Sequence, residues 1–228
     1  MTKMTTANQI IKTLKKLSVP KNKEGMSRYG IDTRYALGVS IPNLRKIAKE
    51  IGRNHELASE LWKTKTHEAR ILASMIDNPA QVTENQLESW VKNFNSWDLC
   101  DQCCMNLFDK TKFAYKKAVQ WSKREEEYVK RAGFALMACL AWHDKDAPNK
   151  KFVEFMPCII NQSIDNRNYV KKAVNWALRQ IGKKNTELNK VAIQTAKKIQ
   201  KIDSKTAKWI AADALRELQS EKVQKRLR

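Results

Sequence analysis

The sequence contains little glycine and little proline, six and five residues among 228. Sandwiches and barrels need a turn every 8–12 residues or so, and dinucleotide-binding folds need glycine-rich phosphate loops. The scarcity of both residues therefore argues against these fold classes and favours a mostly helical chain. Disorder is excluded as well, because 42% of the residues are hydrophobic and seven are tryptophan.

Long hydrophobic runs are also missing. No window approaches about 18 uninterrupted apolar residues, and no apolar signal-peptide segment follows the first residues. We therefore expect no membrane partner and a cytoplasmic protein of bacterial or archaeal type that works at the nucleoid. The five cysteines form an odd set without a secretory signal, which is typical of reduced thiols.

Metal-binding motifs are incomplete. Cys100 and Cys103 form one CxxC, but no second pair and no nearby histidine completes a zinc set. The three histidines are scattered and lack the H-E-x-x-H spacing of zinc proteases. We expect no metal and no other cofactor, and we interpret the cysteines as small apolar residues of a helix.

Acidic residues are heavily outnumbered. The chain has 24 Asp and Glu against 44 Lys and Arg, a formal net charge of +20. Such a surplus creates a positive field that attracts polyanions, nucleic acid first and an anionic membrane surface second. A basic protein without a polyanionic partner is the alternative.

Apolar residues at helical spacing occur in almost every long segment. The segments 128–142 and 169–183 align without a gap, 41 residues apart, and share Y-V-K-[RK]-A; 66–76 and 204–218 are looser copies. A period of about 40 residues with two helices per unit is typical of HEAT-like repeats, which stack into an α-solenoid with a concave surface. An ordinary helical bundle with chance similarity is the alternative.

These patterns predict one domain and a monomer. Residues 1–24 would form an N-terminal helix and a loop after Pro20, 25–218 the helical repeats, and 219–228 a basic tail that is a frayed helix end or an extra phosphate contact. The predicted helices cover 7–17, 41–52, 55–62, 67–77, 84–93, 97–108, 112–122, 127–142, 150–163, 168–182, 186–200 and 204–217.

One predicted helix face combines cations with an aromatic ring. Lys172, Trp176, Arg179 and Lys183 follow one another at spacings of four, three and four residues, which places them on the same face. Cations contact phosphates, and a flat ring packs on sugar or base, so this stripe suits a duplex backbone. For the tryptophan alone, core packing is an equally good interpretation.

The neighbouring copies of this segment carry related residues at the same positions. In the preceding copy the first position is Arg131, and in the following copy Trp209 takes the ring position. Because Trp209 has fewer cationic neighbours, we interpret it as a structural residue. Arg45 and Lys46, near the N-terminus, complete the basic residues that are candidate DNA contacts.

The most unusual segment is NFNSWDLCDQCCMNLF. Trp97 and Asp101 lie four residues apart, about one helical turn. Asp98 falls in the first turn, where the helix macrodipole favours an anion. Asp101 lies deeper, among apolar residues and cysteines, where a carboxylate requires a partner or a task. The structural alternative is a buried pair with an arginine such as Arg131 or Arg179.

Four stretches together resemble the AlkD-type DNA alkylation-repair glycosylases, a family of HEAT-like repeat proteins. They are RYGIDTRYALGVSIPNLRKIAKEI (28–51), the S-W-D-x-x-D of Ser96 to Asp101, YVKRAGFALM (128–137) and VKKAVNWALRQIGKKN (170–185). They keep the family's order and span roughly residues 25–216. The resemblance implies an all-α superhelix of HEAT-like repeats with a concave basic surface.

The resemblance also implies roles for single residues. Asp101 would be the catalytic carboxylate, with Trp97 and Trp176 as aromatic walls beside the sugar of the lesion, and Asp98 would have a supporting role. Arginines would hold the phosphate backbone, and a tyrosine would line the cleft. With the cations from the basic segments, the candidate DNA contacts are Tyr29, Arg131, Arg179, Lys172, Lys183, Arg45 and Lys46.

The implied activity is hydrolysis of the N-glycosidic bond of cationic N3- or N7-alkylated purines in duplex DNA, without base flipping, to leave an abasic site. The chain departs from some members at Ser96, where they have a second tryptophan, and in the cysteine-rich helix that follows. One alternative is a non-catalytic HEAT-repeat protein that binds distorted or branched DNA. A second is an armadillo-like scaffold for acidic peptides.

Overall fold

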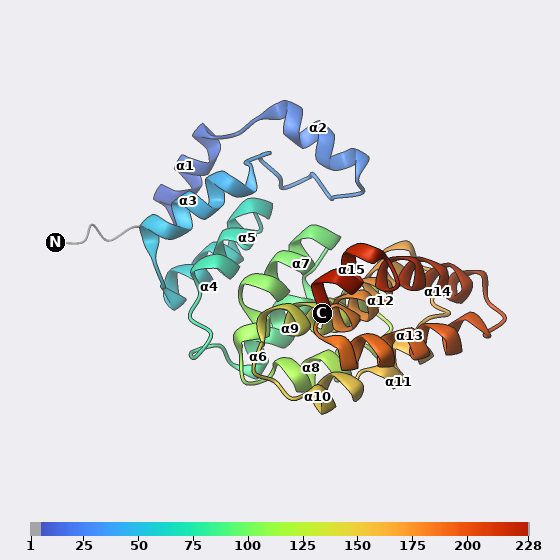
Figure 1. The fold of residues 1–228 in the computed structure, drawn as a ribbon. Helices are drawn as coiled ribbons and strands as arrows, with labels where there is room; N and C mark the ends of the chain where they lie inside the picture. Colours follow the sequence, from blue (N-terminus) through green and yellow to red (C-terminus); the bar gives the residue numbers. More distant parts are fainter. Residues whose placement is uncertain (1–5, 228) are drawn as a thin grey trace. The chain divides into compact units, whose positions relative to one another are not determined.

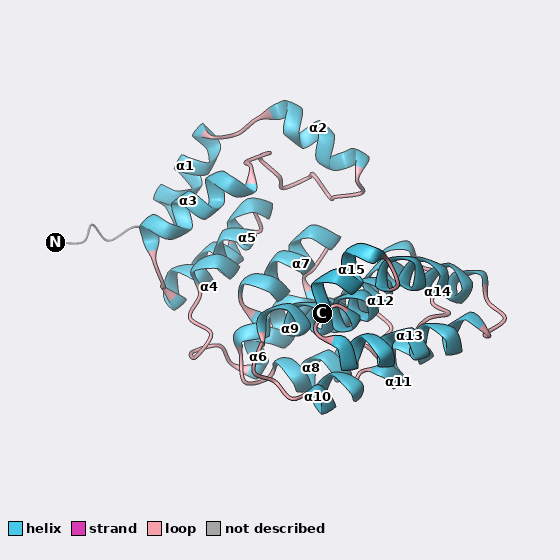
Figure 2. Ribbon diagram, viewed as in Figure 1, coloured by secondary structure: helices cyan, strands magenta, loops and turns pink. Residues whose placement is uncertain are grey.

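The structure, a computed structural model, describes residues 6–227, and within this range it contains helices and no strand (Figures 1 and 2). The predicted all-α class is confirmed. The chain divides into two compact units, Met1–Thr111 and Lys112–Arg228, which are described here one by one. Between residues 6 and 227, no helix has the length and apolar character that crossing a membrane requires.

The first unit contains seven α-helices among its described residues and ends with a short 3-10 turn. Its elements are α1 (Ala7–Lys16), α2 (Pro20–Arg28), α3 (Ile41–Ile51), α4 (His55–Lys63), α5 (His67–Ile76), α6 (Glu84–Lys92), α7 (Trp97–Asn106) and the 3-10 turn η1 (Phe108–Lys110). Thr6 and Gln9 form a capping box at α1, which satisfies two backbone N–H groups that a helix start leaves open. In the core, Trp62 and Trp90 stack with their ring centroids 4.0 Å apart.

The segment after Pro20 is a helix, so the predicted loop is wrong. Proline fixes φ in the helical range and lacks the N–H that the first turn leaves unpaired, and Pro20 accordingly stands in the first turn of α2. No residue of α2 is buried. The prediction failed because apolar periodicity was its main signal, and this helix has no apolar face to show it.

A buried carboxylate holds the loop between α2 and α3. Glu68 is 1% exposed, and its Oε1 accepts hydrogen bonds from the backbone N–H groups of Gly38 at 2.6 Å, Leu37 at 2.9 Å and Val39 at 3.3 Å. Gly38 has a left-handed φ of 77°, and a Cβ there would approach the carbonyl oxygen of Val19 to 2.4 Å. The loop therefore depends on both Glu68 and this glycine.

The second unit is more regular. Its helices are α8 (Ala114–Trp121), α9 (Glu127–His143), α10 (Asn149–Val153), α11 (Met156–Asn161), α12 (Asn168–Gly182), α13 (Thr186–Gln200), α14 (Lys205–Leu218) and α15 (Glu221–Leu227). Helices α9, α12 and α14 pack side by side in one layer, and α8, α11 and α13 pack against them as a second layer (Figure 1). This is the two-helix repeat that the period predicts.

The two aligned copies meet as neighbours in this unit. The rings of Tyr128 on α9 and Tyr169 on α12 stack with centroids 5.9 Å apart. One repeat further, Asn175 Nδ2 donates to Asp213 Oδ2 at 2.6 Å, which joins α12 to α14. The two tyrosines hold equivalent positions of the aligned copies, so neighbouring copies contact each other there.

Two boundaries differ from prediction. The helix predicted over 150–163 is broken into α10 and α11, with Pro157 in the first turn of α11, because proline cannot continue a preceding helix. The tail predicted from 219 forms α15, whose Val223 is buried; Arg228 lies outside the described residues. The single domain and its predicted subdivision stay predictions.

Candidate functional site

Asp98 is fastened to the neighbouring helix by a histidine. His67 Nε2 lies 2.8 Å from Asp98 Oδ2, and the His67 side chain is 3% exposed. Burial lowers the pKa of His67, but the hydrogen bond and charge of Asp98 outweigh it, so that the pKa is raised. Burial raises the pKa of Asp98, but His67 outweighs burial there too, so that the pKa is lowered. Both directions favour a charged pair between α5 and α7.

A small cavity adjoins this pair within the first unit. It has a volume of about 200 Å³ and is lined by His67, Glu68 and Asp98 together with residues of α2 and of the loop before α3. The histidine was missed at the level of sequence, because the two partners are 31 residues apart and no motif links them.

The first turn of α7 also anchors the loop after α2. Trp97 is partly exposed, and its indole Nε1 donates to the backbone carbonyl of Tyr29 at 3.0 Å. Two residues earlier, Asn95 Nδ2 donates to Asp32 Oδ2 at 3.0 Å. The structure therefore brings two candidate site residues, Trp97 and Tyr29, into contact, and it leaves Tyr29 71% exposed.

Asp101 lies one turn after Trp97 on α7 and is partly exposed. The cysteines around it, Cys100, Cys103 and Cys104, are buried, and none of them forms a disulfide. Burial raises the pKa of Cys103 well above its ordinary value. The interpretation of these thiols as apolar helix residues is confirmed.

The stripe on α12 meets acidic residues of α14. Arg179 Nη1 forms an ion pair with Glu217 and lies 3.6 Å from Asp213 Oδ2. Lys183 Nζ lies 2.5 Å from the other oxygen of Glu217. Burial raises the pKa of Glu217, but the two cations outweigh it and lower the pKa. Sequence reasoning missed these acids, although Asp213 and Glu217 stand four residues apart on one helix face.

Two other members of the stripe reach the surface. Lys172 is exposed and Trp176 is partly exposed. The stripe thus offers one exposed cation and part of an indole, while its other two cations are engaged with α14. The interpretation of Trp176 as a core residue is not borne out by its burial.

The remaining candidates differ in exposure. Arg131 is 6% exposed, and its Nη1 donates to the Tyr169 carbonyl at 2.6 Å, across the α9–α12 contact. Arg45 and Lys46 are exposed on α3. Trp209 is 43% exposed, and Lys171 Nζ lies 5.4 Å from its ring centroid; its interpretation as a structural residue stays a prediction.

The described residues contain no group of three or more His, Cys, Asp or Glu side chains that could hold a metal ion.

Comparison with known proteins gives three findings. Residues 10–218 match the family described as "DNA alkylation repair enzyme". "Uncharacterized protein Lin0241" of Listeria innocua is 25% identical over 203 residues, which are 87% of this chain and 88% of that protein. A solved structure described as "A new family of proteins related to the HEAT-like repeat DNA glycosylases with affinity for branched DNA structures" has a TM-score of 0.80 at 21% identity and covers 98% of this chain and 96% of that chain.

These findings confirm the resemblance that the four stretches indicate. They also confirm the HEAT-like repeat fold, since the structural likeness extends over nearly the whole chain.

Proposed function

The chain belongs to the family of DNA alkylation repair enzymes, and from this premise we propose that it is a monofunctional glycosylase acting on cationic N3- or N7-alkylated purines in duplex DNA. The observation that supports this most is on α7. Trp97 and Asp101 stand one turn apart on α7 and are both partly exposed. By this position beside the indole, Asp101 is the carboxylate we assign to the reacting sugar.

The reaction requires stabilisation of positive charge at the sugar. An alkylated purine is already cationic and leaves without a general acid, and the bond from C1′ to the base nitrogen breaks towards an oxocarbenium-like sugar. A carboxylate in a cleft from which water is excluded stabilises such a cation strongly, because Coulomb attraction grows as the effective dielectric falls. Asp101 also orients the water that attacks C1′. The products are the free base and an abasic site.

The hydrogen bond of Trp97 is consistent with this role. It engages the edge of the indole at Nε1, whereas a cation is attracted to the ring face, by about 0.5–2 kcal/mol. In this proposal Trp176 is the second tryptophan that contacts the DNA, and Asp98 holds α7 to α5 through His67. The protein acts as a monomer and grips DNA through Tyr29, Arg131, Arg179, Lys172, Lys183, Arg45 and Lys46, without base flipping.

A single-turnover assay tests the proposal. Purified protein in excess over a duplex containing 7-methylguanine is expected to release the free base. Asp101→Asn keeps the shape of the side chain and removes its charge, so the rate should fall by about 100-fold or more while duplex affinity is retained. Asp203→Asn, the same change at an exposed position, is the control. An unchanged rate in Asp101→Asn would remove Asp101 from the mechanism.

A second candidate function is non-catalytic binding of branched DNA. Two observations favour it: the solved structure with the same fold is described by affinity for branched DNA, and two cations of the α12 stripe are paired with Glu217. This candidate predicts no base release at any enzyme excess and tighter binding to a four-way junction than to a duplex of equal length. In both cases affinity should fall steeply with salt.

A further inference from the structure

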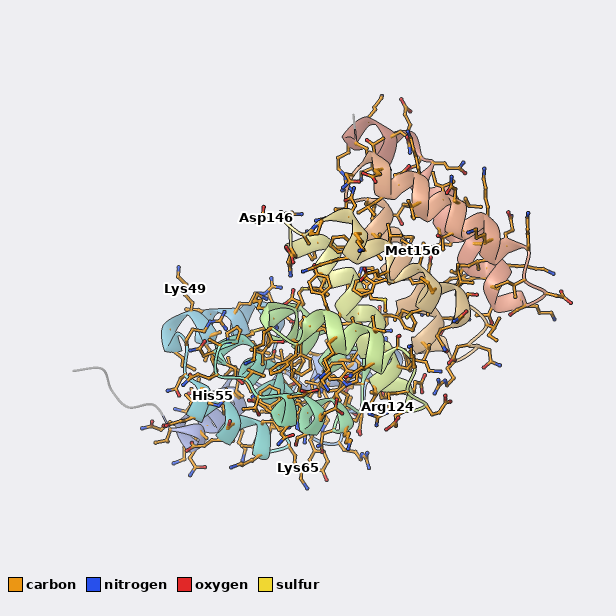
Figure 3. All side chains as sticks on the ribbon, turned by 90° about the horizontal axis from the view of Figure 1, so that it is seen from below. Lys49, His55, Lys65, Arg124, Asp146 and Met156 are labelled. Atoms are coloured by element: carbon orange, nitrogen blue, oxygen red, sulfur yellow. The ribbon has the colours of Figure 1, made fainter. Side chains whose placement is uncertain are left out.

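A second concave site lies in the second unit, built from other parts of the chain than α7. It is a cavity of about 540 Å³ between the last turn of α9, the loop that follows, the end of α12 and the end of α15. Its lining includes four cations and one tryptophan, Lys145, Lys183, Lys184, Arg226 and Trp142, and no acidic residue. The loop on one side of it carries Asp146, which is labelled in Figure 3.

The tryptophan of this cavity is unusually accessible. Trp142 is 51% exposed, although large aromatic side chains normally contribute to the core. Its ring is stacked on the ring of His143, with centroids 5.0 Å apart and an interplanar angle of 26°. A supported but exposed indole offers a flat apolar surface on which a second ring can stack.

The cations around it are held by contacts within the unit. Lys184 Nζ donates to the carbonyl of Asp144 at 2.5 Å, and Arg226 Nη2 donates to the carbonyl of Lys183 at 2.8 Å. These contacts fix the side chains without removing their charge, because the acceptors are neutral carbonyls. A lysine has three N–H donors and an arginine five, so each has donors left for an anion.

Nearby carboxylates have other partners. Asp144 Oδ2 accepts from the hydroxyl of Tyr115 at 2.8 Å, and Asp144 Oδ1 accepts from the backbone N–H of Ala147 at 3.0 Å. Glu217 neutralises Lys183. Asp144 keeps its negative charge, because its partners are neutral, and Asp146 is also close enough to act on Lys184. Neither acid lines the cavity, where the three cations Lys145, Lys184 and Arg226 remain. In keeping with this, burial and then repulsion by Lys145 lower the pKa of Lys184, against the opposing charges of Asp144 and Asp146.

We propose that this cavity binds an unpaired nucleotide of a DNA strand, with the base stacked on Trp142 and the phosphate held by Lys145, Lys184 and Arg226. Exposed aromatic rings beside a cationic groove are the combination by which proteins bind single-stranded DNA independently of sequence. The volume lies within the range of about 300–1,000 Å³ that small-molecule sites occupy, which leaves room for one nucleotide. An anion there relieves the repulsion between Lys145 and Lys184.

This site is additional to the proposed glycosylase site. It uses none of the residues assigned to bond cleavage and shares only Lys183 with the proposed DNA contacts. It recognises a strand that is not base-paired. A repair protein with such a site would hold a frayed end, a flap or the unpaired arm of a branch while the rest of the chain contacts duplex.

The chain offers a matched pair of variants for the test. Trp142→Ala removes the proposed stacking platform. Trp209→Ala removes another exposed tryptophan of the same unit, 43% exposed and with Lys171 Nζ 5.4 Å from its ring centroid, which does not line the cavity. Both positions are exposed, so neither change should unfold the protein.

The measurement is fluorescence anisotropy of a labelled strand of ten thymidine nucleotides. We expect Trp142→Ala to weaken binding about 10-fold, Trp142→Phe to restore most of it, and Trp209→Ala to leave it unchanged. Lys145→Gln should lower the slope of log affinity against log salt by about 0.7, the value for one phosphate contact on a single strand. Equal affinity of Trp142→Ala and Trp209→Ala, or no binding of the strand by the wild type, would overturn the proposal.

Two further arms separate this proposal from others. Thymidine monophosphate as competitor distinguishes a free nucleotide from a strand: displacement shows that one nucleotide suffices, and failure to displace assigns the site to the strand. Excision of 7-methylguanine from duplex should be the same in Trp142→Ala as in the wild type, and strand binding the same in Asp101→Asn. Failure of the glycosylase proposal therefore leaves the strand site standing, and the reverse also holds.

Discussion

The two units are both helical, yet different kinds of contact stabilise them. In the second unit, residues about one repeat apart meet from helix to helix, as in the pair of Arg179 and Glu217, 38 residues apart. In the first unit, buried polar contacts such as His67 with Asp98, or Glu68 with the loop at 37–39, do not recur from one helix pair to the next. The comparison shows that the neighbours of a helix can be predicted from the repeat period in the regular second unit. In the irregular first unit, the packing of the helices depends on particular polar residues.

The difference also concerns function. Trp97 and Asp101, the residues we assign to bond cleavage, lie in the irregular unit, where the first turn of α7 contacts α5 through Asp98 and His67 and the loop after α2 through Trp97. These contacts fix the first turn of α7, and they are not repeated at equivalent positions among the described residues of the second unit. A change in one of them should therefore alter the site more than a comparable change in the second unit.

The largest effect is expected from Glu68→Ala in the first unit. The change leaves several buried backbone N–H groups of the loop at 37–39 without their acceptor, at about 1–3 kcal/mol each. We expect a loss of about 4 kcal/mol in the free energy of unfolding. Hydrogen exchange should show the loss in residues of the first unit before the second.

Glu60→Gln, at an exposed position of α4, is the control and should change stability by less than about 0.5 kcal/mol. If Glu68→Ala unfolds no more easily than this control, the loop does not depend on the buried carboxylate.

Replacing a glycine by alanine should change the free energy of unfolding less than Glu68→Ala does, and in opposite directions in the two units. At Gly133 on α9 a Cβ would come within 2.4 Å of the backbone nitrogen of Ser122, so Gly133→Ala should lower stability by about 3 kcal/mol, since the backbone must shift. At Gly25 on α2 nothing lies within 4 Å, and Gly25→Ala should raise helix stability by about 0.8 kcal/mol.

Urea denaturation of both variants measures this pair. Equal effects of the two changes would mean that the close approach of α8 and α9 at Gly133 is not a constraint on the second unit.

The smallest effect is a pH dependence confined to the first unit. The raised pKa of His67 gives stability that is complete below about pH 6.5, its ordinary pKa, and that is lost as pH rises through the folded-state pKa. The lowered pKa of Asp98 gives stability that is present above about pH 3.9 and lost as pH falls through the folded-state pKa. The pair therefore stabilises most between these values.

Between pH 6 and 9 the wild type should lose stability that His67→Gln does not lose, measured by denaturation at each pH. His143→Gln, at an exposed position of α9, should keep the wild-type profile. A wild-type profile that is flat over this range would contradict the charged pair.

Much of the fold was predictable because helix formation leaves a local signal. The 41-residue offset identified α9 and α12 as neighbouring copies, since equivalent apolar positions recur at the same spacing. The helix α2 was missed because it buries nothing. The exposure of Trp209 could not be predicted, because a ring at a repeated position looks the same in sequence whether its neighbours cover it or not.

For the candidate site, the sequence indicated which residues matter but not what they touch. The resemblance pointed to Trp97 and Asp101 by their spacing, and periodicity placed Arg179 on a stripe. The carboxylate of Glu217, the histidine beside Asp98 and the basic cavity at Trp142 carry no such signal, because their partners come from other helices.

The sequence by itself determined the helical class, the repeat and the family, because residue spacings within a short segment or one regular period indicate each of them. Only the tertiary structure decided which charges face one another, because a pairing such as His67 with Asp98 forms across 31 residues and depends on how the helices pack. Packing sets which cations are paired with an acid, as Lys183 is with Glu217, and which are not. This is a property of neighbouring surfaces and not of any single segment.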